Sequence, residues 1–416
     1  MTQPRNSVRD VRDAHSNRDA RPHSVSTRRR LALGSVAATA ATAALVMPLS
    51  TAWAAQAEVR PAATGRTDLQ RGLDDIVRND GVVGAQATLV NGHGRSSVYS
   101  GTAELGTDRQ MPRQGYFRIG SNTKTFVSTV VLQLVGEGRM RLDDTVDRWL
   151  PGVVKGNGND GRRITVRQLL QHTSGLPDYA SHLPILDADQ FQKHRFDRYQ
   201  PRELVDMALR DRPSFEPGKG WSYSNTGYIL VGMIIKEVTG RHWSDEVRSR
   251  IIEPLGLKHT FSAGTRTDLP QPHAKGYHQF KPGGQLIEST KMSMTSASSS
   301  GDLVTTTNDL ASFWQGLLGG KLLGPKQLAQ MQKTVPTPQE GDAAVKRAGL
   351  GIFWTQLSCG GGSWSHSGGT IGHLNANGFL GKGKKGVIVM RSTNLNKGDR
   401  NKRTDQLVDA TLCKMK

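Results

Sequence analysis

The chain of 416 residues is poor in cysteine, in aromatic residues and in long hydrophobic runs. Its two cysteines exclude a scaffold built from many disulfides and a cysteine-rich zinc module. Only one long stretch lacks charge, which excludes a protein with several membrane spans. Apolar residues make up 36% and charged residues 22%, as in globular proteins, so wholesale disorder is excluded too.

The uncharged stretch follows three arginines and predicts an export signal. The arginines stand at 28–30, before an alanine-rich run over 31–49. Two small-x-small patterns within 52–57 fit a cleavage site. The Thr-Arg-Arg-x-Leu core is similar to a twin-arginine signal, which exports folded proteins. A retained membrane anchor is the alternative, which the weak hydrophobicity opposes. We predict a signal over 1–57, a linker over 58–67 and a secreted or wall-associated protein.

Positive charge dominates, with 55 Lys and Arg against 36 Asp and Glu and a net charge of +19. Residues 1–57 hold eight Arg and three Asp. The rest of the chain therefore has 47 basic and 33 acidic residues, which is a net charge of +14. An exported cationic protein suits an anionic cell wall or membrane surface. Nucleic acid is the rival partner, but the export signal and the lack of a basic-aromatic motif oppose it. The basic run after Leu380 has a simpler interpretation as a solvated helix face and a hairpin turn.

The cysteines are Cys359 and Cys413. In an oxidising compartment such a pair is more often bridged than free. We predict a disulfide between a late strand and the C-terminal segment, which contributes about 4 kcal/mol in the chain-entropy model. A catalytic cysteine is not favoured.

Hydrophobic periodicity predicts an α/β protein of the α+β type. Strands from 68–139 and 302–416 are expected to share one antiparallel sheet flanked by helices, and 140–301 is expected to form an inserted, mostly helical lobe. The cleft between sheet and lobe is the natural ligand site. The predicted helices span 68–79, 123–137, 164–172, 201–209, 226–239, 243–252, 308–318 and 400–412. The predicted strands span 82–90, 95–101, 116–119, 350–357, 363–367, 375–380 and 386–392.

Ser121 and Lys124 form the one Ser-x-x-Lys of the chain. Positions i and i+3 share a helix face, so the amine can reach the hydroxyl. Serine needs a base to act as a nucleophile, and a lysine kept neutral by burial can be that base. The alternative is a serine helix cap followed by an exposed lysine.

Two further tripeptides also occur once each. Tyr223-Ser224-Asn225 offers a proton relay and an amide that can orient a substrate. His366-Ser367-Gly368 ends a predicted strand, and the small residues through Gly369 and Thr370 let a substrate lie along the strand edge. A backbone N–H there can complete an oxyanion hole with that of Ser121.

Together the three motifs resemble those of the penicillin-recognising serine hydrolases, the family of class C β-lactamases and D-alanyl-D-alanine carboxypeptidases. The secreted actinomycete carboxypeptidases are especially similar, over roughly 66–413. This resemblance implies a β-lactamase/transpeptidase-like fold. Further matching segments are Phe117-Arg118-Ile119-Gly120, the stretch 164–176 and Leu357-Ser358-Cys359-Gly360.

The resemblance also implies residue roles. Ser121 is acylated, Lys124 takes its proton, and Tyr223 carries a proton to the leaving group. Asn225 holds the acyl amide, and His366 supports the proton network. The backbone N–H groups of Ser121 and Gly369 bind the oxyanion, and no metal or organic cofactor is required.

The function implied is an exported, monomeric, β-lactam-sensitive D-alanyl-D-alanine carboxypeptidase that acts on peptidoglycan stem peptides or other small D-amino-acid peptides. A β-lactamase, an esterase and a D-amino-acid peptidase remain alternatives. A non-catalytic penicillin-binding wall protein is opposed by the intact motifs. His172, Ser174 and Asp178 suggest another catalytic triad, but no Gly-x-Ser-x-Gly elbow accompanies them. The lack of His-Glu-x-x-His disfavours a zinc carboxypeptidase.

The chain departs from these carboxypeptidases at two positions. They have an arginine for the substrate's C-terminal carboxylate where this chain has Phe353, and a threonine where it has Gly369. Loss of a charge-assisted arginine–carboxylate pair weakens recognition of a free C-terminus. Ser367, Thr370 and a Lys or Arg from a neighbouring strand, such as Arg391, are the candidates for compensation.

Overall fold

The computed structural model divides the chain after Ala57 and describes residues 61–338, 346–395 and 402–416. The predicted export signal and the start of the predicted linker lie outside the described residues. Helix α1 (Pro61–Asp80) begins seven residues before the predicted helix, so the last seven of the ten linker residues are helical instead. Proline suits the first helical position because its missing N–H would have no partner there.

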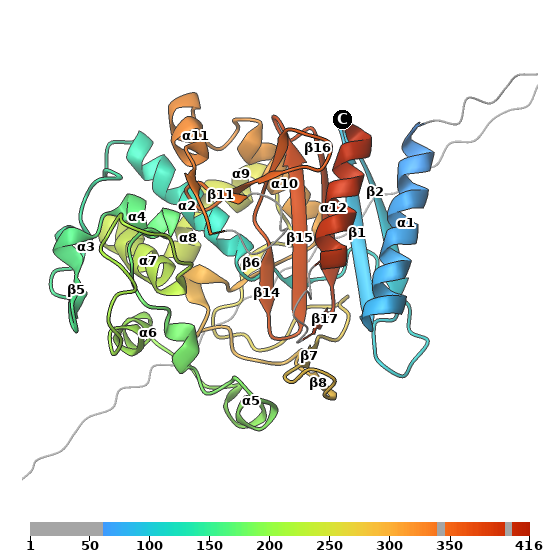
Figure 1. The fold of residues 1–416 in the computed structure, drawn as a ribbon, viewed down its shortest axis with the longest axis horizontal. Coiled ribbons are helices and arrows are strands. Elements are labelled where there is room, and N and C mark those ends of the chain that lie inside the picture. Colours follow the sequence, from blue (N-terminus) through green and yellow to red (C-terminus); the bar gives the residue numbers. More distant parts are fainter. Residues whose placement is uncertain (1–60, 339–345, 396–401) are drawn as a thin grey trace, which may run out of the picture. The chain divides into compact units, whose positions relative to one another are not determined.

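An antiparallel sheet joins strands from both ends of the chain, in the order β10-β11-β12-β13-β15-β16-β1-β2, with β14 paired to β15 (Figure 1). The pairing of β1 with β16 sets Ala85 opposite Arg391. This sheet and its flanking helices confirm the predicted fold class. The strands are β1 (Gly84–Asn91), β2 (Gly94–Gly101), β10 (Val335–Pro336), β11 (Lys346–Ala348), β12 (Phe353–Gln356), β13 (Gly362–Ser365), β14 (Gly368–Thr370), β15 (His373–Leu380) and β16 (Lys385–Arg391).

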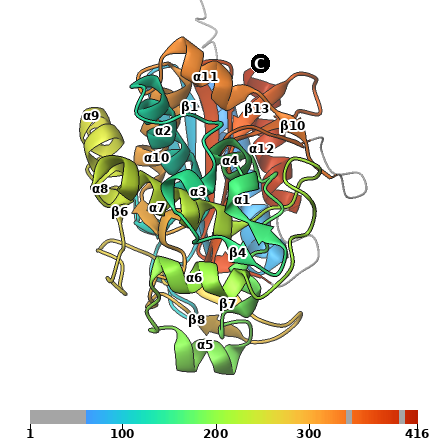
Figure 2. The same ribbon diagram turned by 90° about the vertical axis from the view of Figure 1, so that its left-hand side faces the viewer.

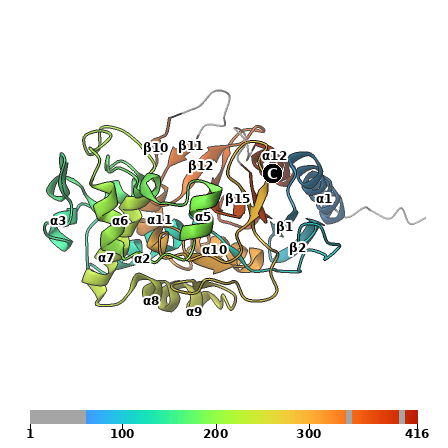
Figure 3. The ribbon, with the colours of Figure 1, turned by 90° about the horizontal axis from the view of Figure 1, so that it is seen from below.

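Two helices far apart in sequence cover one face of this sheet. Helix α1 and helix α12 (Lys402–Met415) lie side by side there (Figures 1 and 3). Alternate residues of a strand point to opposite faces. Accordingly, Val387 and Val389 of β16 join the core beneath these helices, whereas Ile388 and Met390 join the larger core on the opposite face.

The opposite face packs against α2 (Asn122–Gly136) and α10 (Thr307–Leu318). The rings of Phe126 and Phe313 stack where these helices meet, and Trp314 stacks on Phe379 of the sheet. Because α2 lies between the sheet and the helical lobe, nearly all of its side chains are buried. Burial on all sides keeps the start of α2 fixed, and that end carries Ser121.

The helical lobe lies mostly on the side of the molecule that faces the viewer in Figure 2. Its elements are α3 (Val146–Trp149), α4 (Val166–Gln171), α5 (Ala188–His194), α6 (Pro201–Ala208), α7 (Asn225–Thr239), α8 (Trp243–Val247), a π-helical turn (Arg248–Ile252), α9 (Glu253–Leu255), and 3-10 turns at Gly161–Arg163, Tyr179–His182 and Ser298–Ser300. Helix α11 (Pro325–Gln332) follows α10. The minor strands are β3 (Phe117–Arg118), β4 (Lys155–Gly156), β5 (Asn159–Asp160), β6 (Phe261–Ser262), β7 (Tyr277–Gln279), β8 (Leu286–Glu288), β9 (Leu303–Thr305) and β17 (Thr393–Asn394). Across the described ranges, no helix is both long enough and apolar enough to cross a bilayer.

The strand predicted over 350–357 is shorter than expected and begins at Phe353. A turn precedes it, in which the N–H of Gly349 donates to the carbonyl of Ile352. Gly351 has a φ of 73°, and a Cβ there would lie 2.0 Å from Oγ of Ser128 on α2. The close approach of this turn to α2 therefore requires glycine.

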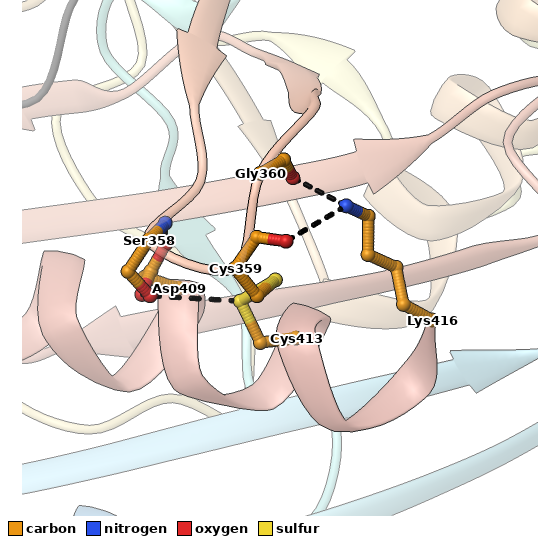
Figure 4. The surroundings of a disulfide bond; sticks show 6 residues. All are labelled: Ser358, Cys359, Gly360, Asp409, Cys413 and Lys416. Atoms are coloured by element: carbon orange, nitrogen blue, oxygen red, sulfur yellow. Dashed lines mark hydrogen bonds between the residues drawn. A yellow bond between two sulfur atoms is a disulfide. The ribbon is translucent and has the colours of Figure 1, made fainter.

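The predicted disulfide is present between Cys359 and Cys413, and it joins the loop after β12 to α12 (Figure 4). The N–H of Ser358 also donates to Asp409 of α12, at 2.9 Å. These contacts hold the C-terminal helix on the sheet face that α1 also covers.

We predict that replacing both cysteines by serine lowers the free energy of unfolding by about 4 kcal/mol, since the bridge closes a loop across a sequence separation of 54. Chemical denaturation of both proteins, each with and without a reducing agent, measures the change. The reductant should destabilise the parent protein alone. An equal effect on both proteins would contradict this account.

Candidate active site

Ser121 directly precedes α2, and its side chain makes no helix-capping hydrogen bond. Ser121 is half-buried, in contrast to the buried residues that follow. Gly120 before it has a φ of 53° and lies against Gly369, since an added Cβ would come within 2.5 Å of the Gly369 carbonyl oxygen. The alternative interpretation of Ser121 as a simple helix cap is therefore wrong.

Lys124 is fully buried rather than exposed. Its Nζ donates to Oγ of Ser121 at 3.0 Å, to Oδ1 of Asn225 at 2.7 Å and to the carbonyl of Ser300 at 2.8 Å. Burial lowers the pKa of Lys124 to about 7, against the opposing effect of the Asp178 carboxylate. Near neutral pH the amine can therefore lose its proton and accept one from the Ser121 hydroxyl, as a general base must.

Tyr223 is the next residue of the site, and the interaction of its hydroxyl with Ser121 opposes the effect of burial on its pKa. Nζ of Lys124 lies 4.9 Å from the centre of the Tyr223 ring. Burial raises the pKa of Tyr223, so its hydroxyl stays protonated. Tyr223 can therefore pass a proton between the lysine and a leaving group without holding a negative charge.

His172 lies beneath Tyr223, with the two rings stacked at 4.3 Å. Its Nδ1 accepts from the N–H of Ser224, and burial lowers its pKa well below the usual value. Ser174 accepts from the N–H of Leu176 instead of facing this imidazole. His172 and Ser174 thus do not form the alternative triad, and His172 supports the Tyr223 ring.

His366 lies on the other side of the site, 5.2 Å from the Phe353 ring and 6.5 Å from the Tyr223 ring. Burial and the charge of Lys124 lower its pKa to about 3, so the imidazole is neutral at physiological pH. Its Nδ1 lies 2.6 Å from the carbonyl of Ser367. A neutral ring can relay protons beside Tyr223 but cannot attract a substrate carboxylate by charge.

Strand β14 places the predicted substrate-binding residues beside the start of α2. Ser367 and Gly369 are exposed and Gly368 is buried. A Cβ on Gly120 would lie 2.8 Å from the nitrogen of Gly369, so this N–H is close to the N–H of Ser121. Oγ1 of Thr370 has no hydrogen-bond partner among the described residues. The backbone can thus supply two neighbouring donors for an oxyanion.

Three buried asparagines, to which no sequence motif assigns a role, connect β14 to the start of α2. Asn375 donates to the carbonyls of Ile119 and Gly368. Asn377 donates to the carbonyl of His366 and to Asn122 of α2, and Asn122 donates to Asn375. The signal in the sequence is an Asn-x-Asn pair on a strand whose other residues are nearly all apolar.

Arg391 does not compensate for Phe353, contrary to the possibility raised by the sequence. It is fully buried, and by alternation it shares the α1 face of β16 with Val389. Its guanidinium lies 3.9 Å from Asp80 at the end of α1. Beside the motifs, the Phe353 ring packs edge-on against Trp221, at 6.3 Å. The wall next to His366 is therefore aromatic.

Comparison with known proteins establishes the family. The family model described as "Beta-lactamase" matches residues 69–412, so the chain belongs to the β-lactamase family of serine hydrolases. The solved D-stereospecific amidohydrolase from Streptomyces sp. is similar, with a TM-score of 0.77 and 36% identity over 83% of this chain and 98% of that chain. The D-amino acid amidase from Ochrobactrum anthropi SV3 is also similar, with a TM-score of 0.74 and 31% identity over 85% of this chain and 98% of that chain.

Curated relatives match over shorter segments. "Penicillin-binding protein 4*" of Bacillus subtilis (strain 168) is 35% identical over 38% of this chain and 33% of its own length. "Penicillin-binding protein 4" of Amycolatopsis lactamdurans is 34% identical over 42% of each. The matched segments thus cover between a third and less than half of the length of these relatives. Together with the motifs and the fold, these likenesses confirm the resemblance to penicillin-recognising serine hydrolases.

We predict that acylation of Ser121 accelerates with rising pH through about pH 7, because Lys124 becomes neutral above its pKa. Lys124→Arg keeps a cation that cannot deprotonate. It should slow acylation by about 10²- to 10⁴-fold and abolish this limb of the pH profile. Stopped-flow labelling with a fluorescent penicillin measures both effects. A variant that keeps the wild-type profile would show that the base lies elsewhere.

We also predict that Asn377→Asp impairs both stability and catalysis, because a carboxylate cannot donate to the His366 carbonyl. The expected loss is about 3 kcal/mol in the free energy of unfolding. Asn159→Asp is the matched control, since the buried Asn159 donates to two carbonyls within the lobe, away from β14. Both variants should unfold more easily, but only Asn377→Asp should acylate slowly while still folded.

Proposed function

We propose that this protein is a serine amidohydrolase that cleaves amide bonds of D-amino-acid substrates through an acyl-enzyme on Ser121. The observation that carries the proposal is the buried Lys124 amine, hydrogen-bonded to Ser121 and Asn225 with a pKa of about 7. Such a pair generates an alkoxide nucleophile near neutral pH without a metal. The whole-length likeness to a D-stereospecific amidohydrolase and a D-amino acid amidase supports the substrate class.

In this mechanism neutral Lys124 takes the hydroxyl proton as Oγ of Ser121 attacks the substrate carbonyl. The N–H groups of Ser121 and Gly369 stabilise the oxyanion that forms. Collapse of the tetrahedral adduct breaks the C–N bond, and the proton on Lys124 passes through Tyr223 to the leaving nitrogen. Water then attacks the ester, with its proton travelling back along the same route, and releases the acid.

The leaving-group side favours amides over free C-terminal carboxylates. Recognition of a carboxylate in a partly desolvated site requires a paired cation. Arg391 does not supply this cation, because it lies on the far face of the sheet, while Phe353 and Trp221 present rings. Short D-peptides, D-amino-acid amides and esters fit this side better than an obligate D-alanyl-D-alanine terminus.

The second candidate is the D-alanyl-D-alanine carboxypeptidase expected from the motifs, acting on peptidoglycan stem peptides. The penicillin-binding relatives favour it, as do the same catalytic groups. Acylation by β-lactams is proposed for both functions. We further propose twin-arginine export to the cell surface, where the net charge of +14 after residue 57 suits an anionic wall.

We predict that kcat/KM for a D-Ala-D-Ala peptide exceeds that for its C-terminal amide by less than about a hundredfold, or ~2.7 kcal/mol. D-phenylalanine amide should be hydrolysed faster than its L enantiomer. Ser121→Ala should abolish both reactions and the penicillin adduct detected by mass spectrometry. Stronger discrimination for the free carboxylate would favour the second candidate, and an adduct persisting in Ser121→Ala would refute the assignment of the nucleophile.

A further inference from the structure

Asp178 belongs to none of the three motifs, yet it contacts one of them directly. Its Oδ2 accepts from Nδ2 of Asn225 at 2.8 Å, and its Oδ1 accepts from the N–H of Ala180 at 3.1 Å. The second bond caps the 3-10 turn Tyr179–His182. One carboxylate therefore links the lobe backbone to the amide of the active site.

We propose that Asp178 is a positioning residue that fixes the amide orientation of Asn225 and balances the positive charge that Lys124 acquires during acylation. The proposal rests on the proposed function in one respect, because it takes Lys124 as the base. It adds a residue whose carboxylate acts through Asn225 rather than on the substrate.

The amide orientation follows from what each group can donate or accept. A side-chain amide has one oxygen acceptor and one nitrogen with two donors. In the observed orientation, Oδ1 of Asn225 accepts from Nζ of Lys124 and Nδ2 donates to Asp178. The reverse orientation would set an NH₂ group against an ammonium and an oxygen against a carboxylate. Asp178 thus excludes the reverse orientation, and the second Nδ2 hydrogen is left for a substrate carbonyl.

Apart from Asp178, the groups that surround the Lys124 amine are uncharged. The ring centres of Tyr223 and Tyr228 lie 4.9 and 5.5 Å from Nζ of Lys124, and burial keeps both phenols protonated. His172 and His366 are neutral, and the Lys124 charge helps to keep them so. The remaining ligands of Nζ are the hydroxyl of Ser121 and a carbonyl oxygen, which carry no charge.

Against these neutral neighbours, the Asp178 carboxylate opposes the effect of burial on the pKa of Lys124. Without Asp178 the ammonium form of Lys124 would be less stable, and this form must exist while the tetrahedral adduct collapses. The carboxylate therefore keeps Lys124 basic enough to hold the serine proton until Tyr223 receives it. A purely structural role, confined to the cap at Ala180, would leave this proton affinity unchanged.

The test compares Asp178→Asn and Asp178→Ser, which are both neutral. Serine is a favoured capping residue, so Asp178→Ser retains the 3-10 turn even if Asp178→Asn fails to fold. In both, the rising limb of the acylation profile should move to lower pH by about one unit, the effect of removing a nearby opposite charge. Acylation at about pH 8 should be about tenfold slower, because the base is weaker.

Two further variants separate the charge from other effects. Asp178→Glu keeps the carboxylate, so its rising limb should stay at the wild-type pH even if its rate falls. Asp187→Asn is the matched control, because Asp187 caps α5 at the outer end of the lobe by accepting from Gln190 (Figure 2). It removes an equivalent capping carboxylate and should leave both rate and profile unchanged.

The measurement is the rate of penicillin labelling at Ser121 as a function of pH, with a melting curve for each variant. A folded neutral variant whose rising limb coincides with wild type overturns the proposal, even if its rate is reduced. If the rising limb of the pH profile moves equally in Asp187→Asn, the proposal is overturned too. If wild type itself forms no adduct at Ser121, the proposed function fails instead, and the two failures are thus distinguished.

Discussion

The chemistry of this protein depends on the removal of one lysine amine from water. Lys124 lies on a helix that is buried on all sides, and its amine donates to three acceptors. Its pKa is therefore about 7, so that a group that is normally protonated can act as a base. The same exclusion of water keeps Tyr223 protonated and His366 neutral. The protonation states of the site are therefore a joint consequence of packing, and α2 is the element that imposes them.

Much of this arrangement could be predicted from the sequence. Ser121, Tyr223 and His366 lie in motifs that each occur once, and the structure brings them together around Lys124. Helix and strand periodicity located most of the long helices and of the longer sheet strands to within a few residues, but it missed α3, α5, α11 and most of the short strands. The errors occurred where tertiary contacts override local preference, as at Gly351, which must approach α2 and so delays the start of β12.

Other features could not be predicted because they depend on which face a side chain occupies. Arg391 is one residue from a position that would face the α2 side of the sheet, and alternation along β16 alone decides that it meets Asp80. Asn375 and Asn377 satisfy buried backbone groups in segments distant in sequence, and no local pattern reveals these partners. In the sequence, Asp178 stands out only beside His172, as part of a triad that the structure does not form.

The pairing of β1 with β16 has a consequence for how the protein matures. The N–H of Val83 donates to the hydroxyl of Thr393, across a sequence separation of 310, so the hairpin of β1 and β2 gains these partners only after the intervening chain has been synthesised. Until then one edge of β1 remains unpaired, and exposed strand edges favour aggregation. In this topology the exposed edge of β1 is therefore shielded only by a strand that lies far away along the chain.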